Sequence, residues 1–254
     1  MYATEDDPEP FNGDPGVMAA LNCRQFMSQQ GEDLEVYVDY FKDREVKGGI
    51  YIEAGAVEGW QASNSWYFEH NEDFTGMLVE ANPRLVRGLR MFRPNNILVI
   101  GALYDADNLQ LTFRVPTNGE HVMLGYIEEH TTERQKATAA PHDPGTFKVP
   151  SVTLGSLVSK ANYSYVDVLF LDIEGGELKA LQGIDWSIPI YVIAIELPSS
   201  DDVQEDELKI TEACRDILRE RGYIFNKAVG CTELWHLPIY RDGKPTLLYD
   251  KSTP

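Results

Sequence analysis

The sequence predicts an α/β fold in which a mostly parallel sheet is covered by helices on both faces. Three observations lead to this prediction. Short apolar runs alternate with helix-length segments along most of the 254 residues, which is the order expected of a parallel sheet. The run at 96–103 is continuously apolar, as in a strand buried on both sides. The hydrophobic content of 43% is typical of a folded globular chain.

The sheet is predicted to be organised around a strand, a glycine turn, a helix and a second strand. These lie at about 50–53, 55–59, 61–71 and 77–80. This order is typical of the mononucleotide-binding half of a doubly wound sheet. A carboxylate about 20 residues beyond the glycine turn is placed to accept hydrogen bonds from ribose hydroxyls. Glu80 is the candidate for that role.

The other elements follow the same alternation. The remaining helices are expected at about 32–44, 83–92, 154–161, 176–182 and 205–221. The remaining strands are expected at about 96–103, 109–115, 149–154, 166–172, 191–196, 223–227 and 233–239. Pro83 can occupy a first helical turn, where its missing N–H costs nothing. The last two strands are predicted to form an antiparallel hairpin.

A single domain is expected over residues 22–254, after a segment at 1–21 that is rich in Asp, Glu, Pro and Gly and is predicted to fray. Residues 116–148 are polar and lack periodicity, as in an inserted substrate lid. The first ten residues have neither the basic start nor the apolar core of a secretory signal. We therefore expect a cytoplasmic protein without a membrane span.

Charge and cysteine content narrow the classes of partner. The formal net charge of −19 and the lack of a basic run argue against nucleic acid, whose phosphates require clustered Lys and Arg. Cys23, Cys214 and Cys231 are scattered and show no zinc or disulfide spacing. No metal is predicted, and the oligomeric state stays open.

Four predicted strands end in or beside a carboxylate: Glu53, Glu80, Asp172 and Glu196. Ligands of open α/β sheets bind outside the carboxyl ends of the strands, so these side chains should face one crevice. Buried carboxylates are costly without partners, which favours a cationic or donor-rich ligand. For any one of them, capping of a nearby helix N-terminus remains an alternative.

The glycine turn discriminates between cofactors. Its two glycines, Gly55 and Gly59, fall short of the three-glycine pattern of nicotinamide sites. Glu58 within the turn would also repel a pyrophosphate. A nicotinamide-dependent oxidoreductase is therefore disfavoured. A cofactor with a ribose, an adenine and a positive charge but no phosphate fits better, and S-adenosylmethionine is such a molecule.

Several longer motifs carry a family resemblance. They are GGIYIEAGAVEGWQASNSWYFE, LVEANP, VPSVTLGSLV, VDVLFLDIEGGELKALQGIDW and VIAIEL. In this order and spacing they resemble the FkbM family of S-adenosylmethionine-dependent O-methyltransferases, from about residue 28 to about residue 237. The resemblance implies a Rossmann-like class I methyltransferase fold with a mostly parallel seven-stranded sheet and a C-terminal antiparallel hairpin.

The resemblance also implies roles for individual residues. The methionine part of the cofactor would be held by Glu53, Gly55, Ala56 and Gly59, with Ser63 as a candidate for its carboxylate. The ribose would be held by Glu80, and the adenosine would be bordered by Asn82, Gly101 and Ala102. Asp172 would contact the cofactor and, with Glu174, face the methyl-transfer site. One position departs from the family, which usually has Asn where this chain has Val57.

Methylation of a hydroxyl requires removal of its proton, so a general base is expected. Asp172 is the first candidate, followed by Glu174 and then by a histidine of the insertion, His121, His130 or His142. The acceptor implied by the resemblance is a small molecule or glycan, with a sugar as the first choice. The alternative is a methyltransferase-fold binding module that has lost turnover.

Overall fold

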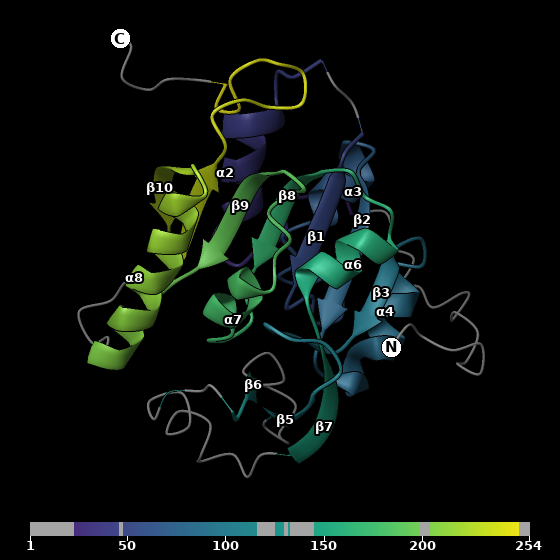
Figure 1. Cartoon of the computed structure of the whole chain (residues 1–254). Helices are drawn as coiled ribbons and strands as arrows, with labels where there is room; N and C mark the ends of the chain where they lie inside the picture. Colours follow the sequence, from purple (N-terminus) through teal and green to yellow (C-terminus); the bar gives the residue numbers. More distant parts are fainter. Residues whose placement is uncertain are drawn as a thin grey trace.

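A computed structural model describes residues 23–45, 48–115, 125–129, 132, 145–198 and 204–248. Within these ranges, seven strands form the central sheet in the order β10-β11-β9-β8-β1-β2-β3 (Figure 1). They are β1 (Ile50–Ala54), β2 (Thr75–Glu80), β3 (Ile97–Ile100), β8 (Val166–Leu171), β9 (Ile190–Glu196), β10 (Ile224–Val229) and β11 (Thr232–His236). β11 runs antiparallel to both of its neighbours, and the other pairs are parallel. The predicted fold class and terminal hairpin are confirmed.

Helices cover both faces of this sheet. They are α2 (Glu32–Val36) with its π-helical continuation η1 (Tyr37–Phe41), α3 (Trp66–Asn71), η2 (Pro83–Leu85) leading into α4 (Val86–Phe92), α6 (Leu154–Lys160), α7 (Glu177–Gln182) and α8 (Glu205–Glu220). In Figure 1, α6, α7 and α8 lie in front of the sheet, and α2 and α3 lie behind it.

Two apolar cores follow from this layering. Ile52 of β1 packs in the core that contains residues of α6, α7 and α8. The preceding residue, Tyr51, packs in the core that contains residues of η1, α3 and α4. Successive strand side chains point to opposite faces, so a strand covered on both faces is buried along its whole length, as 166–171 is, and Asp167 is its one polar residue.

A second sheet was not foreseen from the sequence. Four strands of the described chain form it in the order β4-β7-β5-β6: β4 (Ala102–Leu103), β7 (Gly145–Val152), β5 (Gln110–Val115) and β6 (Tyr126–Ile127). The predicted strand at 96–103 is therefore wrong as one element, because it is interrupted at Gly101. The Gly101 N–H still bonds Glu80 O at 2.9 Å. A Cβ at Gly101 would lie 2.8 Å from Pro150 O, so the chain passes close to β7 where it leaves the central sheet.

Two further differences concern segment boundaries. The helix predicted at 61–71 begins only at Trp66, because the preceding loop adopts left-handed conformations at Gly59 and Ala62. The polar insertion at 116–148 contains β6 and the first residues of β7, and most of its other residues lie outside the described ranges, as does the segment 1–21. No helix in the described part of the chain combines the length and the apolar character that a membrane span needs.

Candidate active site

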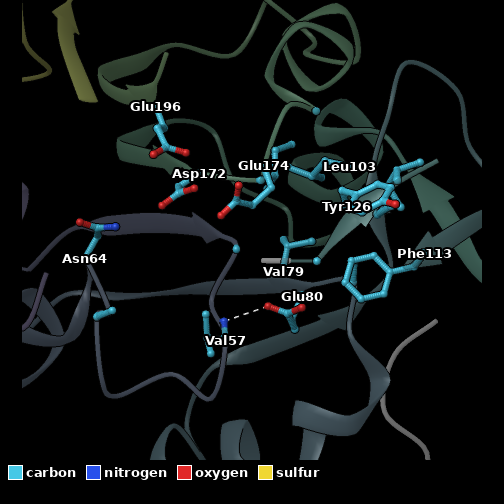
Figure 2. A pocket seen from close by; sticks show the side chains of 18 of the residues that line it. Val57, Asn64, Val79, Glu80, Leu103, Phe113, Tyr126, Asp172, Glu174 and Glu196 are labelled. Atoms are coloured by element: carbon cyan, nitrogen blue, oxygen red, sulfur yellow. Dashed lines mark hydrogen bonds between the residues drawn. The ribbon is translucent and has the colours of Figure 1, made fainter. Parts of the chain in front are cut away.

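A cleft lies at the carboxyl ends of the central strands, between the central sheet and the second sheet (Figure 2). Figure 2 shows Asn64, Asp172 and Glu196 gathered toward one end of the cleft. Phe113 and Tyr126 lie toward the other end. The cleft therefore has a polar end and an apolar end.

Three of the four predicted strand-end carboxylates line this cleft: Glu80, Asp172 and Glu196. They are brought together because the parallel strands β2, β8 and β9 end at the same edge of the sheet. Glu174 also lines the cleft. Glu53, the fourth strand-end carboxylate, is not among the lining residues.

Glu80 is held by the backbone of two loops. Its Oε2 accepts a hydrogen bond from the Val57 N–H at 2.8 Å, and its Oε1 accepts one from the Asn82 N–H at 2.7 Å. Burial raises the pKa of Glu80 to about 7 and outweighs these donors, and the nearby Asp172 raises it further. The carboxyl group is thus fixed in orientation at the point where β2 ends.

Asp172 and Glu196 form a hydrogen-bonded pair of carboxyl groups. Burial, followed by the charge of Glu196, raises the pKa of Asp172 well above its usual value. Burial also raises the pKa of Glu196 to about 7, although its hydrogen bond with Asp172 works in the opposite direction. Two interacting acids of this kind titrate as a unit.

Glu174 stands in the turn between β8 and α7. Its φ of +55° is left-handed, an uncommon conformation for a residue other than glycine. Burial, then the charges of Asp172 and Glu177, raise the pKa of Glu174 to about 8. Glu177 supports the turn because its Oε1 accepts hydrogen bonds from the N–H groups of Ile173, at 3.0 Å, and Gly175, at 3.3 Å.

Glu53 is directed into the loop before α3. Its carboxylate accepts hydrogen bonds from Ser63 Oγ at 2.8 Å, Ser65 Oγ at 2.5 Å and Asn64 N at 2.7 Å. Burial raises the pKa of Glu53, whereas the neighbouring Arg93 and these donors lower it. The structure therefore does not bring Glu53 and Ser63 to the cleft, although the resemblance implied that both contact the cofactor.

Of the other predicted cofactor residues, some line the cleft and some do not. Gly55, Gly101 and Ala102 line the cleft. A Cβ at Gly55 would lie 1.8 Å from Asp172 O, so only glycine fits where β1 and β8 end side by side.

Ala56, Gly59 and Asn82 are not among the lining residues. A Cβ at Gly59 would lie 2.7 Å from Arg93 Cγ. Asn82 is buried, and its Nδ2 has no hydrogen-bond partner within the described part of the chain. His121 lies outside the described residues, as do His130 and His142. The catalytic and cofactor roles of all these residues stay predictions.

Several lining residues were missed in the sequence. They are Gln29, Glu32, Asn64, Phe113, Tyr126 and Ile127. In the loop before α3 the resemblance pointed to Ser63, whereas the side chain that lines the cleft is Asn64. Phe113 alternates with polar residues in β5, a pattern that predicts a strand but not its neighbours.

A mostly parallel seven-stranded sheet with an antiparallel hairpin at one edge is the arrangement of a Rossmann-like α/β fold. The family model for the methyltransferase FkbM domain matches residues 53–225. This range covers more than half of the chain, which therefore belongs to the FkbM methyltransferase family. S-adenosylmethionine is the cofactor of this family.

The solved structures to which the chain is similar are distant in sequence. One is the FkbM methyltransferase of Methylobacillus flagellatus KT, at 15% identity and a TM-score of 0.44, covering 79% of this chain and 47% of that chain. Another is Aeropyrum pernix fibrillarin with natively bound S-adenosyl-L-methionine, at 10% identity and a TM-score of 0.46, covering 84% and 75%. The chain thus spans about half the length of the FkbM methyltransferase structure. Among curated proteins, none matches the chain.

The donor set of the cleft fits S-adenosylmethionine. A fixed carboxylate, Glu80, ends β2, and Gly55 and Gly101 line the cleft without side chains that would fill it. The carboxyl groups of Asp172 and Glu196 favour a cation and would repel a pyrophosphate. Among the described residues, no group of three or more His, Cys, Asp or Glu side chains is arranged to hold a metal ion.

Proposed function

We propose that the chain transfers a methyl group from S-adenosylmethionine to a hydroxyl group of a small molecule or glycan, with a sugar as the preferred acceptor. The observation that carries this proposal is the hydrogen-bonded pair of Asp172 and Glu196 in the cleft. When bound, the cofactor supplies the activated methyl group. The chain has to hold the acceptor oxygen in line and accept its proton.

The two ends of the cleft divide the binding task. Glu80 accepts hydrogen bonds from the ribose hydroxyls, because its carboxyl group is fixed by two backbone N–H groups. The adenine lies against Gly101 and Ala102, which line the cleft next to Leu103. Figure 2 shows Leu103 near Tyr126, toward the apolar end. The amino-acid part of the cofactor extends toward Asn64 at the polar end. This orientation keeps the sulfonium charge near Asp172 rather than near the apolar residues.

The Asp172–Glu196 pair serves as the general base. A base is most effective when its pKa lies near the working pH, and burial places the pKa of Glu196 at about 7. Loss of one proton from the pair leaves a carboxylate that can accept the hydroxyl proton. Glu174 lies beside Asp172 and is the second candidate. A bound cation stabilises the charged form of all three groups.

A polyol is the preferred acceptor on chemical grounds. Carboxyl groups accept hydrogen bonds from several hydroxyls at once, and the polar end of the cleft contains Glu32 as well as Asp172 and Glu196. A net charge of −19 disfavours polyanionic acceptors such as nucleic acids. Uncharged sugars meet both conditions.

The first test is a calorimetric titration of S-adenosylmethionine, and separately of NAD, into the native chain and the Glu80→Ala variant. We expect saturable binding of S-adenosylmethionine that Glu80→Ala loses, and no binding of NAD. Glu220→Ala, which removes an exposed glutamate on α8, should bind as the native chain does. Failure of a folded native chain to bind S-adenosylmethionine would overturn the proposal.

The second test supplies acceptors. Methyl-deficient glycans and free sugars are incubated with the native chain and cofactor carrying a labelled methyl group. Labelled product in which the methyl group is attached to oxygen is expected. Binding of the cofactor without transfer to any acceptor would instead support the alternative, a binding module without turnover.

A further inference from the structure

A buried arginine lies beneath the glycine turn. Arg93 follows α4 and is 0% exposed. Its Nε donates to Glu69 Oε2 at 2.5 Å, and its Nη1 donates to Gly59 O at 2.9 Å and to Ser63 Oγ at 3.0 Å. Its Nη2 donates to Tyr51 OH at 2.6 Å and to Ser65 Oγ at 2.8 Å. All three guanidinium nitrogens therefore have protein partners.

Glu53 approaches the same loop from the end of β1. Ser63 and Ser65 each donate to the Glu53 carboxylate and accept from Arg93. Arg93 Nη1 lies 3.8 Å from Glu53 Oε2. Glu53 and Arg93 thus share the two serine hydroxyls as hydrogen-bond partners. Every member of this buried network is paired, and a fully paired network of this kind fixes one geometry.

The loop held by this network needs external support. Val57, Gly59 and Ala62 all have positive φ, at +50°, +81° and +60°. For residues other than glycine such conformations persist only when the surrounding structure imposes them. The hydrogen bonds from Arg93 to Gly59 O and from the Asn64 N–H to Glu53 supply that constraint on both sides of Ala62.

The supported loop carries a side chain into the cleft. Asn64 lines the cleft between two serines that do not, and its Oδ1 is buried without a hydrogen-bond partner among the described residues. A buried unpaired polar atom is costly. An orphaned amide beside Asp172 at the polar end is therefore an acceptor for a ligand that supplies N–H or O–H groups.

We infer that Glu53 and Arg93 are positioning residues, which hold the loop 59–65 so that Asn64 contacts the amino-acid part of the cofactor. This inference rests on the proposed function, and it assigns Glu53 a different role from the direct cofactor contact that the family resemblance implied. Neither Glu53 nor Arg93 touches the cleft. They affect binding by fixing the position of Asn64, so only the contacts at the polar end of the cleft should depend on them.

The test uses two ligands that differ in that end. S-adenosylhomocysteine carries the amino-acid part, and 5′-methylthioadenosine lacks it while keeping the adenosine. Both are titrated by calorimetry into the native chain, Glu53→Gln and Arg93→Lys. Arg87→Lys is the matched control, because Arg87 is exposed and lies on α4, the helix that Arg93 follows. Circular dichroism confirms that each variant is folded.

We expect Glu53→Gln to weaken S-adenosylhomocysteine binding about tenfold, the effect of losing one hydrogen bond to a charged group. Binding of 5′-methylthioadenosine should change less than about twofold, and Arg87→Lys should change neither. A merely structural role would weaken both ligands equally. Should Arg93→Lys fail to fold, Ser65→Ala removes one shared hydroxyl and should shift the affinities in the same direction by a smaller factor.

Two results would overturn the inference. One is native affinity for S-adenosylhomocysteine in folded Glu53→Gln, and the other is an equal loss for both ligands. Either result leaves the proposed function standing. Failure of the native chain to bind both ligands would instead remove the proposed function, and this inference with it.

Discussion

The buried carboxylates on the two sides of β1 differ in the partners that the chain supplies to them. In the loop before α3, Glu53 has three hydrogen-bond donors and lies beside Arg93. At the ends of β8 and β9, Asp172 and Glu196 have each other. The first arrangement is complete within the chain. The Asp172–Glu196 pair lacks a neighbouring cation of the described chain in these contacts. A ligand that carries a positive charge or hydrogen-bond donors would stabilise it.

This difference suggests different roles for the two groups of residues, a structural one for Glu53 and Arg93 and a chemical one for Asp172 and Glu196. A buried ion pair with every hydrogen bond satisfied fixes one conformation. Two adjacent carboxyl groups raise each other's pKa and are poised to exchange a proton near neutral pH. The comparison can be tested by altering each side separately and measuring turnover, stability and their pH dependence.

The largest effect is expected on turnover. Asp172→Asn keeps the size of the side chain but removes an ionisable member of the pair, and we expect kcat to fall about 10²- to 10⁴-fold. Asp185→Asn, at an exposed position after α7, serves as the control. In the native chain kcat/KM should rise as the pH passes about 7, the pKa of Glu196. Near-native turnover in Asp172→Asn would exclude the pair as the base.

On the other side of β1 we expect a loss of stability. Arg93→Met leaves the buried Glu53 and the half-buried Glu69 without their cation, which should lower the free energy of unfolding by about 3–5 kcal/mol. Urea denaturation measures this change, and Arg87→Met should alter stability by less than about 0.5 kcal/mol. A loss no larger than that of the control would mean that the network is not a scaffold.

The cofactor-free chain should become less stable as the pH rises. Burial raises the pKa of Glu80 and Glu196 to about 7 and that of Glu174 to about 8, from 4.5. Between about pH 4.5 and 8 the folded chain therefore holds protons that the unfolded chain has released, and this stabilisation is lost as the pH passes 7 to 8. Calorimetric melting at pH 5.5, 7 and 8.5 measures it.

A glutamine substitution isolates the contribution of the cleft to that pH dependence. Glu174→Gln cannot ionise, so its melting temperature should fall less steeply with pH than that of the native chain. Parallel curves for the two proteins would show that the pH dependence arises elsewhere, for example from the net charge of −19.

The smallest effect is expected at Val57. A β-branched residue is strained at φ +50°, whereas Asn tolerates left-handed backbone. Val57→Asn should therefore raise the free energy of unfolding by about 1 kcal/mol, and Val57→Gly should gain less because of its extra backbone entropy when unfolded. Thermal melting measures both. A loss of stability in both variants would show that packing of the valine outweighs the strain.

The sequence predicted the elements whose signals are local. Continuous apolar runs indicated β8 and β9, and Pro83 indicated the start of the helical segment that contains α4. The carboxyl groups at the ends of β2, β8 and β9 could be placed at one edge because parallel strands share that edge. This reasoning located Glu80, Asp172 and Glu196 in the cleft.

The misplaced features depend on contacts between distant segments. Glu53 ends its strand as the other carboxylates do, but Arg93, 40 positions later, and two serines direct it into the loop. The interruption at Gly101 follows from the approach of Pro150. Asn64 has no periodic pattern around it, so its position at the cleft could be found only from the folded loop.

The interruption at Gly101 has a consequence for how the family can diversify. Ala102 and Leu103 of β4 pair directly with Ser151 and Val152 of β7, so the chain enters and leaves the second sheet at adjacent points. Doubling the length of the segment between such points costs only about 0.6 kcal/mol in loop closure. The segment between these points can therefore vary in length within the family, while the central sheet keeps its register.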